Sequence, residues 1–380
     1  MYQKQIKKDN DKKIFNYIYK EKSDISIKKT SLALELSLPT VKRIFLDLLK
    51  KDILKKVKKN SATSGSGRKH QEYEINSDFC YSIGISIYID KMIFLLINGN
   101  GKVKEKFIIK ENINKNKFLE NIQTELKEFL SEFSDDIKEK IVGIGISVLG
   151  MTIKENDIIQ ISEDLRISFK DIFNSLNEFG YKLYIENRSN CIAITEKILG
   201  HGKNLKNFIL LNIDSKIGMS SFNENFSKSS MNFFAGRIEH LCIEIDGNPC
   251  ECGGKGCLGT YISNKALLQN FKNDFKEIQQ YHEIFTENYL IDIKSKKILS
   301  NYIKYLSIGI KNLIYLYNPD KIIITGNISK YKNFIEEELL ETIYSNNNFF
   351  KGRETILFSS FSNYSSSIGA SLIPIIDNFF

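Results

Sequence analysis

One short segment carries a set of side chains that constrains how this chain can fold. Residues 240–257 read HLCIEIDGNPCECGGKGC, in a chain that has only six cysteines and four histidines. One imidazole and three thiolates make a complete tetrahedral set for Zn²⁺, and a closed set leaves no position for a reactive water. We therefore expect a structural zinc site with the ligands His240, Cys250, Cys252 and Cys257. The alternative is a group of thiols that bind no metal, but this spacing of one histidine and three cysteines seldom arises by chance.

The cellular compartment decides how such cysteines are used. No apolar run approaches the roughly 20 residues that cross a bilayer, and the N-terminus MYQKQIKKDNDKK is polar where a signal peptide has an apolar core. We expect a cytoplasmic protein without a membrane partner, in which clustered cysteines hold a metal more often than they form disulfides. With 380 residues, 42% of them hydrophobic, the chain can form two or three domains with cores of their own.

The net positive charge of the chain comes from its N-terminal fifth. Residues 1–78 contain 19 Lys and Arg against 10 Asp and Glu, whereas the rest of the chain contains 35 against 36. Such an asymmetry predicts a basic module that meets a polyanion, joined to a neutral module with another task. A solvated lysine-rich surface is the alternative.

The basic segment also has the periodicity of a helix-turn-helix. Ser37 can cap a helix that has Pro39 in its first turn, and apolar residues then recur at the spacing of one buried face. These residues are Val41, Ile44, Phe45, Leu48 and Leu49. Before this helix, SIKKTSLALEL predicts a shorter one with Leu32, Ala33 and Leu36 facing inward, and IFNYIY predicts a helix before that.

The outward face of the helix after Ser37 suits DNA. Polar and basic side chains lie near its N-terminus, the end that a recognition helix turns towards base edges. ILKKVKK and QEYEIN then predict two strands joined by the flexible tip NSATSGSGRKH, a wing suited to phosphate or minor-groove contact. We predict a winged helix-turn-helix over residues 1–78 that binds a double-stranded DNA operator. Its candidate contacts are Lys28, Lys29, Thr40, Lys42, Arg43, Arg68 and Lys69.

Another use of this segment is contact with a protein, but a small helical domain for that purpose leaves the basic helix face and the basic wing unexplained. Helix-turn-helix proteins usually bind as dimers whose recognition helices meet half-sites about one helical turn apart. We therefore expect a homodimer, or a higher homo-oligomer, on an inverted repeat.

The larger module alternates apolar strands with helices. FCYSIGISIYI, IVGIGISVLG, KLYIEN and FILLNI read as strands, while residues 114–133 and SNCIAITEKILG read as helices. This order predicts α/β layers with mixed sheets in two lobes. A cleft between the lobes is the expected ligand site.

In this order the segments resemble the ROK family of repressors, open reading frames and sugar kinases. The strongest likeness is His240 followed by G-x-x-C-x-C-G-x-x-G-C-L, which is similar to the zinc signature of the family. GIGISVLG, IENRSNCIAITE, NPDKIIITGNIS and SSIGASLI resemble four further family motifs. Members with an N-terminal winged helix-turn-helix are transcription regulators, usually repressors that a sugar or sugar phosphate releases from DNA.

The resemblance implies a fold and its domain boundaries. The module would be a two-lobed actin-like ATPase fold, related to ribonuclease H, with a zinc knuckle. Lobe 1 would span residues 79–190, completed by about 364–380. Lobe 2 would span residues 191–363 and contain the zinc-binding segment 240–257.

Three positions depart from what the resemblance implies for a kinase. The segment SIYID, residues 86–90, stands where ROK kinases have Asp-x-Gly-Gly-Thr, and DSKIG, residues 214–218, stands where they have Gly-Thr-Gly-Ile-Gly. Arg188 replaces the catalytic Asp, and a guanidinium cannot deprotonate a sugar hydroxyl. We expect no enzymatic activity.

The sugar pocket implied by the resemblance is altered as well. Asn187 and His240 match the family, but Arg188 and Arg237 replace two carboxylates and Glu239 replaces a glycine. Two guanidinium groups facing the cleft would suit an anionic sugar, because they pair with phosphate or carboxylate in a bidentate fork. Alternatively, the arginines pair with Glu239 or Glu186 and no small ligand binds.

Three functions therefore stay open. The chain is a repressor of carbohydrate-related genes that senses a sugar derivative, or a DNA-binding regulator whose second module docks a protein, or a sugar kinase. We favour the first.

Overall fold

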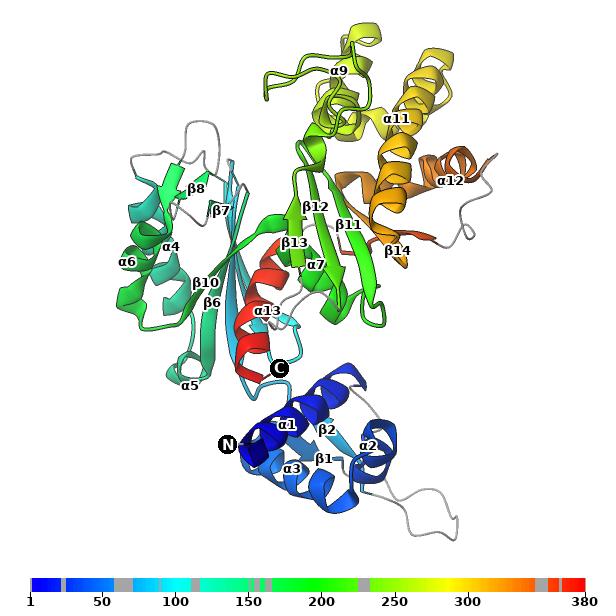
Figure 1. Cartoon of the computed structure of the whole chain (residues 1–380). Helices are drawn as coiled ribbons and strands as arrows, with labels where there is room; N and C mark the ends of the chain where they lie inside the picture. Colours follow the sequence, from blue (N-terminus) through cyan, green and yellow to red (C-terminus); the bar gives the residue numbers. More distant parts are fainter. Residues whose placement is uncertain are drawn as a thin grey trace. The chain divides into compact units, whose positions relative to one another are not determined.

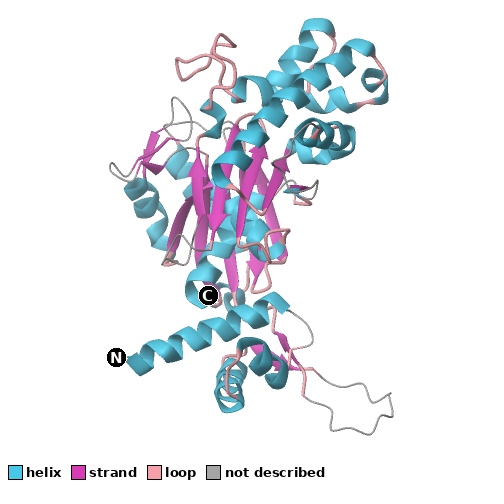
Figure 2. Cartoon of the chain, turned by 45° about the vertical axis from the view of Figure 1, so that its right-hand side comes forward, coloured by secondary structure: helices cyan, strands magenta, loops and turns pink. Residues whose placement is uncertain are grey.

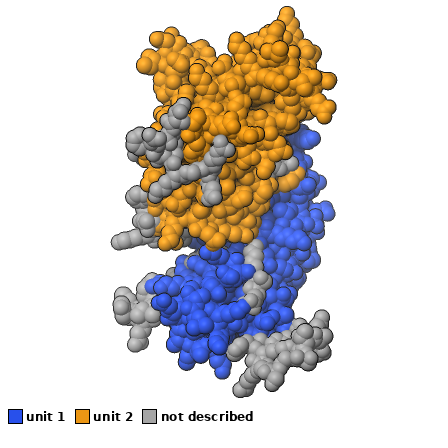
Figure 3. Space-filling view, turned by 90° about the vertical axis from the view of Figure 1, so that its right-hand side faces the viewer, with its two compact units in different colours: residues 1–186, 367–380 blue, residues 187–366 orange. Residues whose placement is uncertain are grey.

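The structure is a computed structural model of the 380-residue chain. It describes residues 2–21, 25–57, 71–88, 90–110, 117–149, 152–153, 158–160, 166–224, 233–345, 355–361 and 364–379. Two compact units emerge, one formed by residues 1–186 with 367–380 and the other by residues 187–366 (Figure 3). Within the described ranges, no helix has the length and apolar character needed to cross a membrane.

Three helices and a small sheet form the N-terminal part of the first unit (Figure 1). They are α1 (Tyr2–Glu21), α2 (Ile27–Leu34), α3 (Leu38–Lys50), β1 (Leu54–Lys56) and β2 (Tyr73–Ile75). β1 and β2 pair antiparallel. Ser26 caps α2 and Ser37 caps α3, each accepting a hydrogen bond from a backbone N–H of the first turn. Glu35 ends α2 in the left-handed conformation, with φ 54°, so the turn between the two helices is tight.

The predicted buried face of α3 is confirmed, whereas that of α2 is not. Val41, Ile44, Phe45 and Leu48 of α3 are buried, and Leu49 is half-buried. In α2 the prediction was wrong, because Leu32 is 71% exposed, Ala33 is exposed, and only Leu36, which follows the helix, is half-buried. Ser26 and Thr30, four residues apart and therefore on the same face of the helix, are the buried residues instead.

The remainder of the first unit is built on a five-stranded mixed sheet of order β10-β6-β3-β4-β5. The strands are β3 (Tyr81–Ile87), β4 (Met92–Asn98), β5 (Val103–Ile109), β6 (Ile141–Val148) and β10 (Leu183–Asn187). β3, β4 and β5 form an antiparallel meander, and β6 runs parallel to β3. Helices α4 (Phe118–Ser131) and α6 (Phe169–Leu176) pack their apolar faces on the sheet. The unit also contains α5 (Asp135–Glu139) and a small sheet of β7 (Thr152–Ile153), β8 (Ile158–Gln160) and β9 (Arg166–Ser168).

A repeated tetrapeptide lets the C-terminal helix approach this sheet closely. Ile-Gly-Ile-Ser occurs at residues 83–86 in β3 and at residues 144–147 in β6, and the two copies pair in register. Side chains at Gly84 and Gly145 would overlap the backbone carbonyls of Ser367 and Ala370. Both carbonyls belong to α13 (Ser365–Phe379), red in Figure 1. The neighbouring glycines therefore form a shallow channel in which the helix backbone lies on the sheet.

Replacement of Gly145 by alanine should destabilise the first unit by about 3 kcal/mol, because the added methyl meets backbone that cannot rotate away. The measurement is the midpoint of thermal unfolding. Gly180→Ala is the control, since nothing lies within 4 Å of the added methyl and only the strain of its φ of 73° should appear. That strain is worth roughly 1–2 kcal/mol. If the Gly145→Ala protein unfolded at the same temperature as the wild type, α13 would not pack on these strands.

The second unit is built on a sheet with the same arrangement of strands, in the order β13-β12-β11-β14-β15. The strands are β11 (Asn207–Ile213), β12 (Ile217–Asn223), β13 (Phe233–Gly236), β14 (Lys321–Gly326) and β15 (Ile356–Phe358). Three strands again form an antiparallel meander, and β14 runs parallel to β11 and β15. The predicted α/β fold with mixed sheets is confirmed.

Helices cover both faces of this second sheet (Figure 2). α7 (Arg188–Leu199) packs on one face through Ile192 and Ala193. The other face carries α8 (Gly259–Ile262), α9 (Asn264–Asp274), α11 (Ile293–Tyr317) and α12 (Glu336–Tyr344). α10 (Glu287–Leu290) precedes α11.

Candidate functional site

The second unit brings the predicted zinc ligands together. The ligand atoms of His240, Cys250, Cys252 and Cys257 all lie within 4.8 Å of one another. The Sγ of Cys250 is 3.5 Å from Nδ1 of His240, and the sulfurs of Cys252 and Cys257 are 3.7 Å apart. Tetrahedral zinc with its usual Zn–N and Zn–S bonds would separate such atoms by about 3.5–3.8 Å. The four side chains therefore surround a space of the size that one zinc ion takes.

The loop between these ligands depends on glycine. Gly253 and Gly256 have φ of 86° and 67°, and a side chain at Gly256 would overlap the backbone carbonyl of Glu244. The loop closes through hydrogen bonds from Cys250 N to the carbonyl of Gly254, 2.9 Å, and from Ile243 N to that of Gly256, 2.8 Å. This tight path brings ligands only two residues apart to one point.

The thiols of the cluster differ in acidity. Burial raises the pKa of Cys257 to about 12. A hydrogen bond from the backbone of Gly254 lowers the pKa of Cys252. Metal binding requires thiolates, so an incoming dication must displace the proton that burial holds on Cys257. Oε1 of Glu239 lies 3.7 Å from Nε2 of His240, whereas Sγ of Cys250 lies beside the other ring nitrogen, Nδ1. A carboxylate there can orient the ring of a metal-binding histidine.

The cluster is joined directly to the core of the second unit. Leu258 follows Cys257, is fully buried, and lies against Gly309 of α11, where any side chain would crowd its methyl groups. The hydroxyl of Tyr261 accepts a hydrogen bond from Asn248 N, 2.8 Å, and its ring packs on Tyr305 of α11 at 4.2 Å. An ion held in the loop would therefore fix α8 against α11.

The predicted sugar-pocket residues occupy different environments. Asn187 caps α7, its Oδ1 accepting a hydrogen bond of 2.8 Å from the backbone N–H of Ser189. Arg188 begins that helix and is 8% exposed, whereas Arg237 is exposed. Glu239 is half-buried beside His240.

A half-buried carboxylate that the sequence did not reveal as a partner, that of Asp214, interacts with Arg188. Oδ1 of Asp214 accepts a hydrogen bond of 3.0 Å from the backbone N–H of Asn327, and Oδ2 accepts one of 3.3 Å from the side chain of Asn212. Burial raises the pKa of Asp214 even though these hydrogen bonds and the charge of Arg188 lower it. Lys216, on the same turn, pairs with Glu251 at 2.8 Å and lowers the pKa of that carboxyl.

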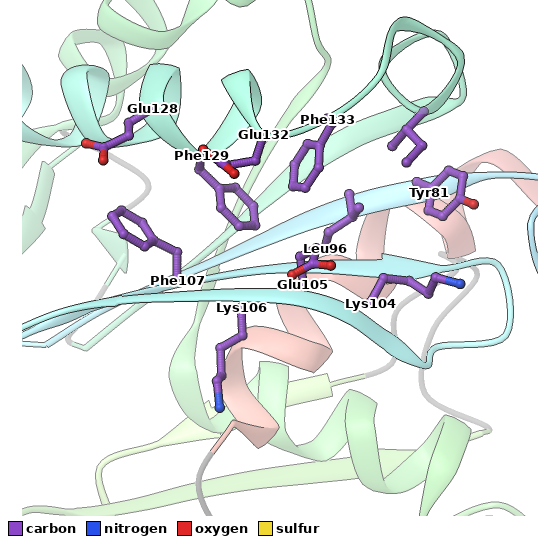
Figure 4. A pocket seen from close by; sticks show the side chains of 11 residues that line it. Tyr81, Leu96, Lys104, Glu105, Lys106, Phe107, Glu128, Phe129, Glu132 and Phe133 are labelled. Atoms are coloured by element: carbon purple, nitrogen blue, oxygen red, sulfur yellow. The ribbon is translucent and has the colours of Figure 1, made fainter.

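A groove of about 440 Å³ in the first unit has no predicted site residue in its wall. It lies between α4 and the edge of the sheet at β5 (Figure 4). Phe129 and Phe133 reach from the helix side towards the strands, with Phe107 opposite. Its rim carries both acidic and basic side chains.

The N-terminal part of the first unit presents three of its predicted DNA contacts fully to solvent. Lys28, Lys29 and Lys42 are exposed, and Thr40 bonds to the hydroxyl of Ser37 at 2.8 Å. Arg68 and Lys69 lie outside the described residues.

Arg43 has two acidic neighbours in place. Its guanidinium lies 3.5 Å from carboxylate oxygens of Asp11 in α1 and of Asp47 in α3. Asp47 could have been expected from its spacing of four residues along one helix. The contact with Asp11 depends on how α1 packs, and no pattern in the sequence predicts it.

Comparison with protein families decides the family of the chain. Residues 82–375 match the model of the ROK family. The chain belongs to the ROK family. The xylose repressor of Bacillus subtilis (strain 168) is 27% identical over 387 residues, covering 98% of this chain and 96% of that protein.

Solved structures of ROK proteins share the fold. A ROK family transcriptional regulator, described as a homologue of the E. coli Mlc protein, superposes with a TM-score of 0.78 at 20% identity and covers 98% of both chains. The ROK hexokinase of Thermus thermophilus gives a TM-score of 0.63 at 18% identity. It covers 77% of this chain and 97% of its own. The hexokinase thus accounts for the ROK module and leaves a further part of this chain unmatched, whereas the regulator spans almost all of it.

Proposed function

We propose that this ROK protein is a DNA-binding transcription regulator, a repressor of carbohydrate-related genes, that senses a sugar or a sugar derivative. The observation that carries the proposal is the share of the chain that a known repressor matches. The xylose repressor matches 98% of the chain, including the basic N-terminal part that lies before the ROK match at residues 82–375. That part contains the net positive charge, so the region that a regulator has and a kinase lacks is also the region suited to DNA.

In the proposed DNA complex, α1–α3 with β1 and β2 act as a winged helix-turn-helix. α3 is the recognition helix, entering the major groove with Thr40 and Lys42 near its N-terminus. Lys28 and Lys29 of α2 and the wing residues Arg68 and Lys69 contact the phosphate backbone. Arg43 reaches DNA by exchanging its contacts with Asp11 and Asp47 for phosphate. The regulator acts as a homodimer on an inverted repeat.

The ROK module of the proposed regulator does not catalyse phosphoryl transfer. Arg188, at the position of the ROK kinase catalytic carboxylate, is largely buried at the start of α7 and cannot act as a base. Asp214 adds a negative charge to the turn that follows β11, where a nucleotide phosphate would be repelled.

Zinc in the proposed site has a structural role. His240, Cys250, Cys252 and Cys257 form a closed set that leaves no position for substrate, and the ion would supply cross-linking of the loop rather than chemistry.

The effector of the proposed regulator binds near Asn187, Arg188, Arg237, Glu239 and His240. We expect xylose, or an anionic relative such as a sugar phosphate or sugar acid, to raise the melting temperature of the zinc-loaded protein, because a ligand of the native state alone stabilises it. A concentration of 100 times Kd contributes about 2.7 kcal/mol. The measurement is a thermal shift against neutral sugars, sugar phosphates and sugar acids.

A variant at Arg237 tests the chemistry of that effector. If the effector is anionic, Arg237→Ala should reduce the shift by sugar acids and sugar phosphates and leave any shift by neutral sugars. Lys296→Ala, an exposed cation of α11, is the control. A protein that binds its operator but shifts with no sugar would contradict sugar sensing and point to a protein partner for the ROK module.

A further inference from the structure

The last turn of α13 lies against the N-terminal helix α1 (Figure 1). The ring of Phe379 in α13 stacks on that of Phe15 in α1, with the ring centroids 5.6 Å apart. It also meets the ring of Phe79 edge-on at 5.0 Å, and the rings of Phe15 and Phe79 are 6.4 Å apart. Phe15 is 3% exposed. Three aromatic rings therefore join α13 to the first helix of the part that we propose to bind DNA.

The segment that links β2 to β3 adds to this contact. Phe79 belongs to that segment, and a side chain at Gly99 would overlap its ring. The backbone N–H of Gly99 donates a hydrogen bond of 2.8 Å to the carbonyl of Ser77, and the carboxylate of Asp78 lies 3.7 Å from the ammonium of Lys104. The linker is therefore packed on the turn between β4 and β5, and it offers α1 a fixed surface rather than a loose tether.

The same end of α13 is bonded to strand β10. Oδ2 of Asp377 accepts a hydrogen bond of 2.7 Å from Nζ of Lys182 and one of 2.8 Å from the hydroxyl of Tyr184. These bonds hold the pKa of Asp377 below its usual range, and the charge of Lys12 in α1 adds to the effect. The last turn of α13 therefore has partners in both β10 and α1.

Both ends of α13 are held by elements that meet at the proposed effector residues. β10 ends at Asn187, and α7 begins at Arg188. Within α7, the hydroxyl of Thr195 donates a hydrogen bond of 2.6 Å to the carbonyl of Ser365, the first residue of α13. A ligand that displaces Asn187 or Arg188 therefore acts on both ends of one helix. Packed side chains and rigid elements of this kind carry energetic coupling between distant sites.

α1 in turn contacts the proposed recognition helix. The carboxylate of Asp11 in α1 lies 3.5 Å from the guanidinium of Arg43 in α3. Asp11 and Phe15 are four residues apart, so they lie on the same side of α1. A shift of α1 at Phe15 therefore also moves the carboxylate beside a predicted DNA contact.

We propose that α13 couples the effector site to the DNA-binding helices, and that Phe379 is the positioning residue through which α13 acts on α1. A ligand bound at Asn187 and Arg188 displaces α7 and β10, and α13 follows because it is bonded to both. The ring of Phe379 then carries α1 and Asp11 with it. Phe379 itself contacts neither the DNA nor the effector. The inference rests on the proposed function, since it needs an operator and a sugar that releases the protein from it.

The contact is tested first without sugar or DNA. Phe379→Ala should speed hydrogen–deuterium exchange of the backbone amides of α1 around Phe15 at least about tenfold, because the helix loses the ring on which it packs. Phe173→Ala is the matched control, since it removes a 39% exposed ring of α6 in the same unit and should leave exchange in α1 unchanged. Unchanged exchange in α1 of a folded Phe379→Ala protein would overturn the proposal.

The coupling is tested on the full-length, zinc-loaded protein with an operator selected from random duplexes. Operator affinity is measured without sugar and with xylose, glucose 6-phosphate or gluconate. The sugar that acts on the wild type should weaken operator binding at least about tenfold, a usual size for coupling between two sites. In Phe379→Ala the same sugar should change operator affinity by less than about twofold, yet still raise the melting temperature as it does in the wild type. Phe379→Tyr keeps the ring and should respond like the wild type.

A second substitution assigns the effect to the ring contact. Phe15→Leu keeps an apolar side chain in the core but removes the stacked ring, so it should also reduce the response to the sugar. Combined with Phe379→Ala, it should cause no further loss, because both residues act through one contact. Additive losses would overturn the assignment to this contact.

The outcomes separate this inference from the proposed function. A wild type that responds to a sugar, together with a Phe379→Ala protein that responds equally, would overturn the inference and leave the proposed function standing. A wild type whose operator binding none of the sugars alters would overturn the proposed sugar sensing and the coupling with it.

Discussion

Cys257→Ser protein should purify without its zinc and with a destabilised second unit. Cys257 is the buried member of the cluster, and Leu258, next to it, packs on α11, so loss of the ion loosens a contact in the main core of that unit. Loss of a structural metal is among the few changes that cost more than about 4 kcal/mol in a single substitution. Zinc content by mass spectrometry and the midpoint of thermal unfolding measure the effect.

Cys242→Ser is a matched control for this prediction. Cys242 lies in the same segment and its backbone pairs with that of Cys257, but its side chain is exposed and outside the cluster. This variant should keep zinc and melt like the wild type. A Cys257→Ser protein that kept both its zinc and the melting temperature of the wild type would refute the assignment of the ligands.

Lys42→Glu should reduce operator affinity more than tenfold at physiological salt. Lys42 is exposed on α3 near the end that meets DNA, and its reversal replaces an attraction to phosphate by a repulsion. The dependence of log K on log salt should become shallower by about one unit for each phosphate that the variant no longer neutralises. Fluorescence anisotropy on a labelled operator over a range of salt concentrations gives both quantities.

Two further variants show whether α3 is correctly identified. Lys296→Glu reverses an exposed lysine of α11 and should leave the salt slope unchanged. Asp11→Ala removes one of the two carboxylates that contact Arg43 and should tighten binding. Equal affinity and equal salt slope in the Lys42→Glu and wild-type proteins would mean that another element enters the groove.

Short-range patterns in the sequence predicted the local structure around both sites. The spacing of Val41, Ile44, Phe45 and Leu48 identified the buried face of α3, and Ser37 marked its start. The spacing of one histidine and three cysteines predicted the cluster that the fold brings together. In α2 the same reasoning failed, because an eight-residue helix shows too few turns to fix which of Thr30 and Leu32 faces inward.

Contacts between distant segments could not be predicted in this way. Asp214 and Asn327 are 113 positions apart, and their hydrogen bond exists because β11 and β14 end side by side. The ion pair between Asp11 and Arg43 depends likewise on the packing of α1 against α3. The channel for α13 depends on two glycine-containing strands pairing in register, and neither strand alone indicates what will lie on it.

The most direct test of the proposed function is selection of DNA by the zinc-loaded, full-length protein from a library of random duplexes, repeated in the presence of xylose, sugar phosphates and sugar acids. A sugar-responsive repressor of this kind should enrich an inverted repeat, and recovery of that DNA should fall when the effector is added. Failure to enrich any sequence over the input library would contradict the proposed function, because the basic N-terminal domain would then have no specific DNA to recognise.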